Sequence, residues 1–483
     1  MKILKDEGIT FDDVLLVPQK TSLTSRSQAS TKTKLTRNID LNIPIVSSNM
    51  DTVTESKMAI AMARLGGIGI VHRYMSIEEE VRQVSRVKRS ESVVIDEPYT
   101  ITPRQTVQAA MNLMRQVGVS SLIVVSSGKK IAGILTSRDV VFVQQPLKVT
   151  VADVMTPKER LHTAKAGVSE EQARKILEQH RIEKLPLINA AGEVAGLITV
   201  KDIIEKKTLF PNAVKDSKGK LLVGAAIGVK GDYLERAQEL SRAGCDVLVL
   251  DIAHGHADYA IDAIKRIKRS LGSRCELIAG NVATYQGAKD LARAGADAVK
   301  AGIGPGSICI TRIVAGAGVP QVTCLAECCK VMTQMGVPII SDGGIRTSGD
   351  VAKALAAGAS SVMIGSRLAG TEESPGATIV RDGIKYKVCR GMASLGAALG
   401  RADRSGEQIA DDDVGEVVAE GVEALVPYRG SVSEIVHQLT GGLCSGMSYC
   451  GAKTIPELWK KAVFMRITNA SVTESHPHDL ERV

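Results

Sequence analysis

The feature that most constrains the fold of this chain is a regular alternation of short strand-like runs with longer helical stretches. Each run is rich in Val, Ile and Ala and ends in Gly, Asp, Asn or Ser, which is typical of buried parallel strands that end in turns. The stretches between them have the period of amphipathic helices. We count eight such runs: Pro44–Met50, Gly67–His72, Leu221–Gly228, Asp246–His254, Glu276–Val282, Ala298–Gly304, Pro338–Gly344 and Ser361–Gly365.

Eight strand–helix units predict an α/β fold, a (β/α)8 TIM barrel. The clearest predicted helices are Asp232–Ala243, Tyr259–Leu271, Thr323–Met335 and Gly349–Ala357. Aromatic residues make up only 3% of the chain, with one Trp and four Phe against 45 Gly, so small aliphatic residues must build the core. This composition disfavours a β-sandwich, and a doubly wound parallel sheet remains the alternative.

Charge and cysteine content narrow the class of protein. The chain has 61 Lys and Arg against 53 Asp and Glu, a net charge of +8, with no run of five like charges. A nucleic-acid partner is therefore not expected, whereas a phosphorylated small molecule is. The nine cysteines show no disulfide-type spacing, and we find neither an amino-terminal signal region nor an apolar run of membrane-spanning length. We expect a soluble, cytoplasmic protein that binds no membrane.

The second and third runs are separated by about 150 residues, far more than one connection needs. Two similar units, Ser92–Val141 and Val151–Ile204, lie in this gap. Each ends in a strand followed by a Thr-x-x-Asp element, Thr136 to Asp139 and Thr199 to Asp202, offset by 63 residues. We predict a barrel in two parts, 1–91 and 207–483, with an inserted regulatory domain at 92–206.

The repeated unit resembles a cystathionine-β-synthase (CBS) module, and the pair resembles a tandem CBS (Bateman) domain. The resemblance implies that Thr136, Asp139, Thr199 and Asp202 hold the ribose of adenine or guanine nucleotides, which would make the insert a site of allosteric regulation. A purely structural insert with solvated charges is the alternative.

The segment most informative about chemistry is Gly302–Arg312, which follows the sixth predicted strand. Its alternating glycines and a proline predict a loop at the face where barrel enzymes place their sites. A glycine-rich loop exposes backbone N–H groups that favour a thiolate, so Cys309 is the candidate nucleophile. Most other cysteines fall within strand or helix patterns and are expected to be inert.

Two further glycine-rich turns follow the seventh and eighth predicted strands, where many barrels bind phosphate through backbone N–H groups. We predict that Ser307, Gly344, Gly365 and Ser366 form a phosphate cradle. Asp342, at a strand end, would accept hydrogen bonds from ribose hydroxyls. The alternative for any one of these glycines is an ordinary tight turn.

Together these motifs resemble the family of inosine-5′-monophosphate (IMP) dehydrogenase and guanosine-5′-monophosphate (GMP) reductase. The resemblance covers nearly the whole chain and rests on Phe11–Pro18, Ser48–Glu55, the CBS insert, Val223–Ala226, Gly280–Thr284, the Cys309 loop, Ser341–Gly344 and Gly370–Gly376. It implies a barrel enzyme in which Cys309 attacks C2 of a purine nucleotide while hydride passes between C2 and a nicotinamide.

The resemblance also implies residue roles. Thr311 and Glu420 would handle protons at the base, with Arg404 as a further catalytic residue, and Gly391 and Met392 would join the substrate site. Cofactor-binding residues would be Asp251, Asn281 and Gly302. A potassium ion would be held at Gly304, Gly306 and Cys309, completed by Glu474, Ser475 and His476 of a neighbouring subunit. A homotetramer follows, with pairing into octamers left open.

Three positions depart from the dehydrogenase pattern. Family dehydrogenases activate water with an Arg-Tyr pair in a flap, but here Ser405 follows Arg404. Cys389 stands where a phosphate-binding Tyr is usual, and Ala393 replaces a Gly. A reductase needs no hydrolysis, so we predict a GMP reductase that uses NADPH. The alternatives are an IMP dehydrogenase that forms xanthosine monophosphate (XMP) with NAD, and a non-catalytic nucleotide-binding regulator.

Overall fold

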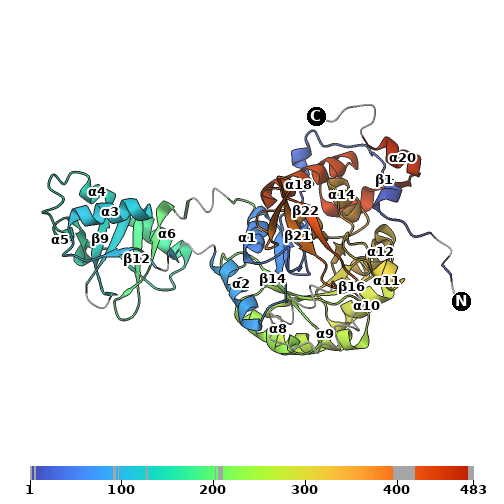
Figure 1. The fold of residues 1–483 in the computed structure, drawn as a ribbon, viewed down its shortest axis with the longest axis horizontal. Helices are drawn as coiled ribbons and strands as arrows, with labels where there is room; N and C mark the ends of the chain where they lie inside the picture. Colours follow the sequence, from blue (N-terminus) through green and yellow to red (C-terminus); the bar gives the residue numbers. More distant parts are fainter. Residues whose placement is uncertain are drawn as a thin grey trace. The chain divides into compact units, whose positions relative to one another are not determined.

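The computed structural model of the chain describes residues 3–4, 7–90, 94–95, 97–126, 129–201, 203–204, 210–394 and 419–476. The chain forms two compact units, one from Met1–Ser90 with Asn212–Val483 and the other from Glu91–Pro211 (Figure 1). Each unit has its own buried apolar core.

Eight parallel strands close into a barrel in the first unit. They follow the order β14-β15-β16-β17-β18-β19-β4-β5 around the barrel. Their bounds are β4 (Ile45–Ser47), β5 (Ile68–Val71), β14 (Gly224–Ile227), β15 (Val247–Leu250), β16 (Glu276–Val282), β17 (Ala298–Ala301), β18 (Ile339–Asp342) and β19 (Ser361–Ile364). All eight lie within the predicted runs, so the TIM barrel is confirmed and the doubly wound sheet was wrong.

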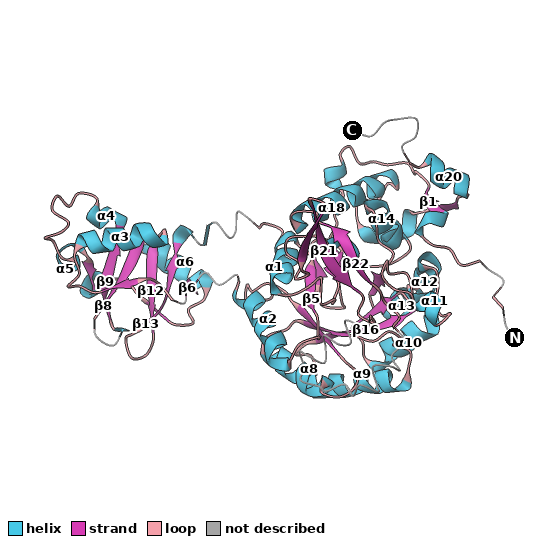
Figure 2. Cartoon of the chain, in the orientation of Figure 1, coloured by secondary structure: helices cyan, strands magenta, loops and turns pink. Residues whose placement is uncertain are grey.

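Amphipathic helices surround the barrel (Figure 2). They are α1 (Ser56–Leu65), α2 (Ile77–Arg89), α8 (Tyr233–Arg242), α9 (Asp258–Leu271), α10 (Tyr285–Ala294), α12 (Gln321–Cys328), α13 (Lys330–Met335) and α14 (Ser348–Ala356). Local sequence sets their ends. The Thr347 side chain accepts from the Asp350 N–H and the Asp350 carboxylate accepts from the Thr347 N–H, which starts α14 at Ser348, one residue before the predicted start.

One predicted helix was wrong in its extent. Thr323–Met335 is two helices, α12 and α13, because the helical hydrogen bonding is interrupted at Cys329. The apolar period continues through both helices, so the sequence pattern does not reveal the break. Cys329 is buried at this break, and a Cβ added to Gly358 would lie 2.8 Å from the Cβ of Cys329.

The remaining elements of this unit lie outside the barrel strands. A three-stranded sheet follows the eighth strand, and β1, early in the chain, pairs with β23, late in the chain. The elements are η1 (Phe11–Asp13), β1 (Val14–Leu16), η2 (Arg26–Gln28), β2 (Thr33–Lys34), β3 (Asp40–Leu41), α11 (Thr311–Val314), α15 (Ser366–Ala369), β20 (Thr378–Arg381), β21 (Ile384–Arg390), β22 (Glu423–Pro427), α18 (Val432–Tyr449), α19 (Ile455–Lys461), β23 (Phe464–Arg466) and α20 (Asn469–Glu474).

The second unit contains two four-stranded sheets, ordered β10-β9-β8-β7 and β11-β12-β13-β6. Its elements are β6 (Val94–Ile95), β7 (Thr100–Ile101), α3 (Val107–Val117), β8 (Ser121–Val125), β9 (Ile131–Thr136), α4 (Ser137–Val140), α5 (Val151–Val154), β10 (Thr156–Pro157), η4 (Lys158–Arg160), β11 (Ala164–Lys165), α6 (Glu170–Gln179), β12 (Lys184–Ile188) and β13 (Val194–Thr199). The 63-residue offset read from the sequence maps β8 onto β12 and β9 onto β13 residue by residue.

The two repeats of this unit exchange their first strands. β6 belongs to the first repeat but pairs with β13 of the second, and β10 belongs to the second repeat but pairs with β9 of the first. A small core of Ile123, Ile131 and Ile134 with Leu197 joins the two repeats. Neither repeat therefore completes its sheet without the other.

The described helices include none that is both long and apolar enough to cross a membrane.

We expect the barrel unit to fold without the second unit. Removal of residues 91–211 would leave two ends, Ser90 and Asn212, that both lie beside the end of α1. Arg64 donates to the Ser90 carbonyl at 3.5 Å. Asn42, whose N–H donates to the Gly66 carbonyl, donates from its side chain to the Asn212 carbonyl at 2.8 Å. A short Gly-Ser bridge from Ser90 to Asn212 should give a protein with one cooperative thermal transition by circular dichroism. Residues 91–211 expressed alone serve as the control and should show their own transition. Aggregation or a non-cooperative transition of the bridged barrel would contradict the independence of the two units.

Candidate active site

Two glycines allow the loop after β17 to pass against the next strand. Gly302 has a φ of 146° and Gly304 a φ of 84°, conformations that favour glycine. A Cβ on Gly302 would lie 2.1 Å from the Asp342 carbonyl oxygen, so no larger residue fits there. The loop therefore lies close to the end of β18 and carries Cys309 at the carboxyl-terminal face of the barrel.

The far side of this loop is hydrogen-bonded to a segment more than a hundred residues later in the chain. Ile310 N–H donates to the Glu420 carbonyl at 2.8 Å, and Val422 N–H donates to the Ile308 carbonyl at 3.0 Å. These bonds place Glu420 beside the loop.

The predicted catalytic residues Cys309, Thr311 and Glu420 form one hydrogen-bonded chain. Cys309 Sγ lies 3.2 Å from Thr311 Oγ1, and the Thr311 hydroxyl donates to Glu420 Oε2 at 2.7 Å. A hydroxyl donates one proton and accepts others, so Thr311 can pass a proton between the thiol and the carboxylate. Arg404, the fourth predicted catalytic residue, lies outside the described residues.

Two adjoining cavities meet at this loop. A cavity of about 440 Å³ is lined by Cys309, Thr311 and Glu420 together with the predicted residues Asp251, Asn281, Gly302, Gly391 and Met392. A second, of about 270 Å³, is lined by the predicted cradle residues Ser307, Gly344, Gly365 and Ser366. Both are lined by Ser48, Met50 and Asp342, so one continuous site extends from the thiol to the cradle.

A buried ammonium group that sequence reasoning missed forms the floor of the larger cavity. Lys300, in β17, is 5% exposed, and its Nζ donates to Asp342 Oδ2 at 2.5 Å and to Asn281 Oδ1. Asn281 Nδ2 in turn donates to Asp342 Oδ2 at 2.9 Å and to the Gly302 carbonyl at 2.7 Å. A lysine inside a strand expected to be buried was the available signal, because a buried charge requires partners.

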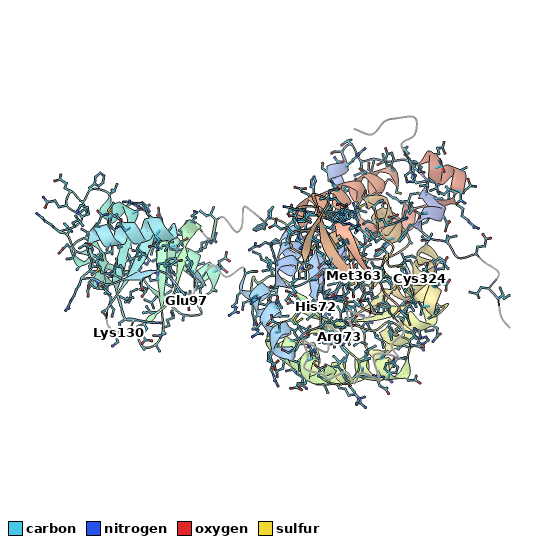
Figure 3. All side chains as sticks on the ribbon, in the orientation of Figure 1. His72, Arg73, Glu97, Lys130, Cys324 and Met363 are labelled. Carbon is cyan, nitrogen blue, oxygen red and sulfur yellow. The ribbon has the colours of Figure 1, made fainter. Side chains whose placement is uncertain are left out.

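Asp251, which also lines this cavity, is held in a second polar cluster. Arg73 Nε donates to its Oδ2 at 2.9 Å and Asn49 Nδ2 to its Oδ1 at 3.0 Å. Arg73 follows β5 (labelled in Figure 3) and was not predicted from the sequence. The predicted cofactor-binding residues Asp251 and Asn281 therefore line one cavity with the Cys309 thiol.

Comparison with known proteins identifies the family of this chain. The protein-family model of the IMP dehydrogenase / GMP reductase domain matches residues 8–478 of this chain. The chain belongs to the IMP dehydrogenase / GMP reductase family. Enzymes of this family are purine nucleotide oxidoreductases that use NAD(P).

Relatives named IMP dehydrogenase and relatives named GMP reductase both match nearly the whole chain. It is 55% identical to inosine-5′-monophosphate dehydrogenase of Nitrosopumilus maritimus (98% of each chain covered) and 48% identical to GMP reductase of Leishmania major (99% of this chain, 98% of the relative). The crystal structure of a Cys-to-Ala variant of GMP reductase from Trypanosoma brucei, in complex with GMP, covers 99% of this chain and 98% of its own at 45% identity and a TM-score of 0.84.

In this member of the family, the segment after β21 closes one side of the cavity. Gly391 N–H donates to the Val422 carbonyl at 3.0 Å, and the Met392 carbonyl accepts from the Tyr74 hydroxyl at 2.8 Å. Cys389, at the position where the family usually has a tyrosine, is fully buried, and burial raises the pKa of its thiol to about 11. Neither cavity is lined by Cys389, so it does not replace that tyrosine as a phosphate ligand.

The residues predicted for potassium lie in two separate places. Gly304, Gly306 and Cys309 belong to the glycine-rich loop, whereas Glu474 ends α20 and is followed by Ser475 and His476. Ser475 Oγ donates to the Ser471 carbonyl at 2.8 Å, and both Ser475 and His476 are exposed. Within one chain, these three carboxyl-terminal residues line neither cavity of the site.

In the second unit, the two Thr-x-x-Asp elements differ in surroundings. Thr136 and Asp139 form a capping box at the start of α4, with Thr136 Oγ1 donating to Asp139 Oδ2 at 2.8 Å. Thr199, its counterpart, lines a cavity of about 720 Å³ together with Tyr99, Lys184 and Lys201. Asp202 lies outside the described residues.

We predict that Cys309→Ala abolishes turnover, with a fall of about 10³-fold or more, while GMP affinity measured by calorimetry stays within about tenfold. The cradle does not include the thiol, so binding should survive. Cys444→Ala is the matched control, because Cys444 is also a partly exposed thiol but lies in α18, away from both cavities. Residual turnover of a tenth or more in Cys309→Ala would contradict a covalent role.

We also predict that Lys300→Met weakens nucleotide binding and lowers the free energy of unfolding by about 3 kcal/mol, because it leaves the Asp342 carboxylate without its cation. Lys268→Met is the matched control: Lys268 pairs with Asp297 at 2.8 Å and lines neither cavity. Urea denaturation and GMP titration should show a loss of stability in both variants and a loss of GMP affinity only in Lys300→Met. Unchanged GMP affinity in Lys300→Met would refute its role in the site.

Proposed function

We propose that this chain is a GMP reductase, which converts GMP to IMP and ammonia with NADPH through a covalent bond between Cys309 and purine C2. The observation that carries the proposal is the hydrogen-bonded chain Cys309–Thr311–Glu420, because it connects a nucleophile to a carboxylate through a hydroxyl beside the reacting carbon. Such a chain can protonate a departing amino group without a water-activating residue.

The Cys309 thiol gives its proton through Thr311 to Glu420, and the thiolate forms a bond to C2. The proton returns through Thr311 to the 2-amino group, which leaves as ammonia when the C2–N bond breaks. Bound NADPH supplies the hydride that takes the place of the amino group at C2. The C2–S bond then breaks, so that the thiolate departs and IMP is formed.

Sequence favours the reductase over the dehydrogenase, and one relative removes an argument against it. Ser405 occupies the position of the tyrosine in the Arg-Tyr pair with which family dehydrogenases activate water. The inserted second unit would argue for a dehydrogenase if reductases lacked it, but the Leishmania GMP reductase is matched over 98% of its length by 99% of this chain. The family therefore includes a relative named GMP reductase that matches this chain along nearly its full length, inserted unit included.

We further propose roles for the residues that hold the substrates. Ser307, Gly344, Gly365 and Ser366 bind the phosphate, and Gly391 and Met392 bind the base. Asp342 accepts from the ribose hydroxyls, while Asp251, Asn281 and Gly302 face the nicotinamide. Support comes from their common position around the two adjoining cavities.

For the assembly, we propose a homotetramer with potassium between subunits. The ion would be held by carbonyl oxygens of Gly304, Gly306 and Cys309 and by Glu474, Ser475 and His476 of a neighbouring copy. Carbonyl oxygens are hard ligands that suit a hard cation, and the exposed carboxyl-terminal residues line neither cavity of their own chain. The nine free thiols fit a reducing compartment, so we propose the cytoplasm.

The second unit, residues 91–211, is proposed to be a tandem CBS domain that binds purine nucleotides and regulates the barrel. Its strand-swapped repeats support this proposal, as does the cavity at Thr199, which is also lined by the aromatic ring of Tyr99 and by Lys201. Thr136, Asp139 and Asp202 would complete the two ribose contacts. The barrel bridged from Ser90 to Asn212 should then keep its activity but lose any response to GTP or ATP.

IMP dehydrogenase is the second candidate function. Arg404 is retained, and the relative with 55% identity is named an IMP dehydrogenase. A non-catalytic regulator would not need the hydrogen bonds that connect Cys309 to Glu420 through Thr311, and their presence argues against that third alternative.

We predict that the purified protein oxidises NADPH and releases ammonia with GMP, and forms XMP from IMP and NAD slowly. Glu420→Gln should lower GMP reduction by about 10²–10⁴-fold, because an amide cannot exchange the proton that the departing ammonia needs. Glu423→Gln, on the exposed part of β22, is the control and should keep the full rate. Absorbance of the reduced nicotinamide and an ammonia assay measure both reactions. Rapid XMP formation with no ammonia from GMP would overturn the reductase in favour of the dehydrogenase.

A further inference from the structure

Tyr74 lies at the edge of the site and has no role in the reaction described above. It follows β5 in the turn after Val71 and is only 7% exposed. Its N–H donates to His72 Nδ1 at 3.1 Å, and the guanidinium carbon of Arg73 lies 5.2 Å from the centre of its ring. The bond to His72 therefore holds the Tyr74 backbone and the Arg73 guanidinium contacts its ring, at the turn that bears His72 and Arg73 in Figure 3.

The Tyr74 hydroxyl connects this turn to the opposite wall of the cavity. It donates to the Met392 carbonyl at 2.8 Å, across 318 residues of sequence. Met392 belongs to a turn closed by Ser394 N–H on the Gly391 carbonyl at 3.0 Å, and Glu420 N–H donates to the Ala393 carbonyl at 3.0 Å. The turn is thus fixed on one side by the segment that carries Glu420 and on the other by Tyr74.

The turn that carries Tyr74 is itself firmly anchored. Arg236 Nη1 donates to the Met75 carbonyl at 3.1 Å, and the same guanidinium pairs with the buried Glu80 carboxylate at 2.6 Å. On the cavity side, Arg73 holds Asp251. Tyr74 therefore extends from a rigid base.

The bond to Met392 determines which group of one peptide faces the cavity. In a trans peptide the carbonyl and the following N–H point in opposite directions, so fixing the Met392 carbonyl also fixes the Ala393 N–H. Ala393 lines the cavity that contains Cys309. Rotation of this peptide would exchange a hydrogen-bond donor for an acceptor beside the bound base.

We propose that Tyr74 is a positioning residue for purine recognition, which holds the Met392–Ala393 peptide so that its N–H is presented to an acceptor atom of the base. The proposal rests on the purine nucleotide binding proposed above. The phosphate cradle, which is made by other loops, does not depend on Tyr74.

Tyr74→Phe tests this proposal, because it removes the hydroxyl and keeps the buried ring. Dissociation constants for GMP and IMP, measured by calorimetry, should rise about threefold to tenfold, as expected for the loss of one hydrogen bond, while that for ribose 5-phosphate stays within about twofold. Tyr285→Phe is the matched control: its hydroxyl lies 2.5 Å from Gln334 Oε1 on α13, it lines neither cavity, and its constants should be unchanged.

Hydrogen–deuterium exchange without nucleotide provides a readout that needs neither turnover nor ligand. The amides of residues 391–394 should exchange faster in Tyr74→Phe than in the unmodified chain, and those of 302–310 should not. Unchanged exchange at 391–394 would overturn the proposal, as would an equal loss of affinity for ribose 5-phosphate and GMP, since that would indicate a general disturbance of the site. Failure of the unmodified chain to bind GMP or IMP would refute the proposed function, and the exchange result would still decide whether Tyr74 orders the turn.

Discussion

The active site depends first on one buried positive charge. The Lys300 ammonium is almost inaccessible to water, and a charge so placed is tolerated only with close partners of opposite charge or strong polarity. Asp342 and Asn281 are those partners, and Asn281 also holds the Gly302 carbonyl. The ends of β16, β17 and β18 are thereby fixed together, and the start of the loop that leads to Cys309 is fixed with them.

Sequence reasoning predicted the barrel well because its evidence is local. Each strand is a short aliphatic run that ends in a turn residue, and this pattern does not depend on distant parts of the chain. Cys309 was predicted from its glycine-rich loop, whereas Thr311 and Glu420 came from resemblance to a family, since nothing local distinguishes Glu420 from a surface carboxylate. Lys300, Arg73 and Tyr74 were missed because their roles arise from contacts between strands that are far apart in sequence. The break between α12 and α13 was missed for a different reason: apolar periodicity reports burial and not the continuity of hydrogen bonds.

The second unit shows a limit of repeat analysis. The offset of 63 residues matches β8 to β12 and β9 to β13 residue by residue, including the irregular pairing at Val124–Val125 and at Leu187–Ile188. It does not reveal that β6 and β10 are exchanged between the repeats, because an exchanged strand has the same sequence as one that pairs within its own repeat. Exchange makes the pair of repeats the smallest unit that completes both sheets, and this agrees with their sharing the core around Ile134 and Leu197.

The position of Glu420 late in the chain has a consequence for synthesis. Every strand of the barrel, and every residue of the phosphate cradle, lies before residue 367, whereas the hydrogen bonds that bring Glu420 to the Cys309 loop need the segment from residue 419 onward. A chain emerging from the ribosome amino terminus first can thus close its barrel and form the cradle while the carboxylate has not yet been made. Such a nascent chain would have its phosphate cradle but neither the base-binding Gly391 and Met392 nor a route for the proton of Cys309, so the parts of the site would be acquired one after the other.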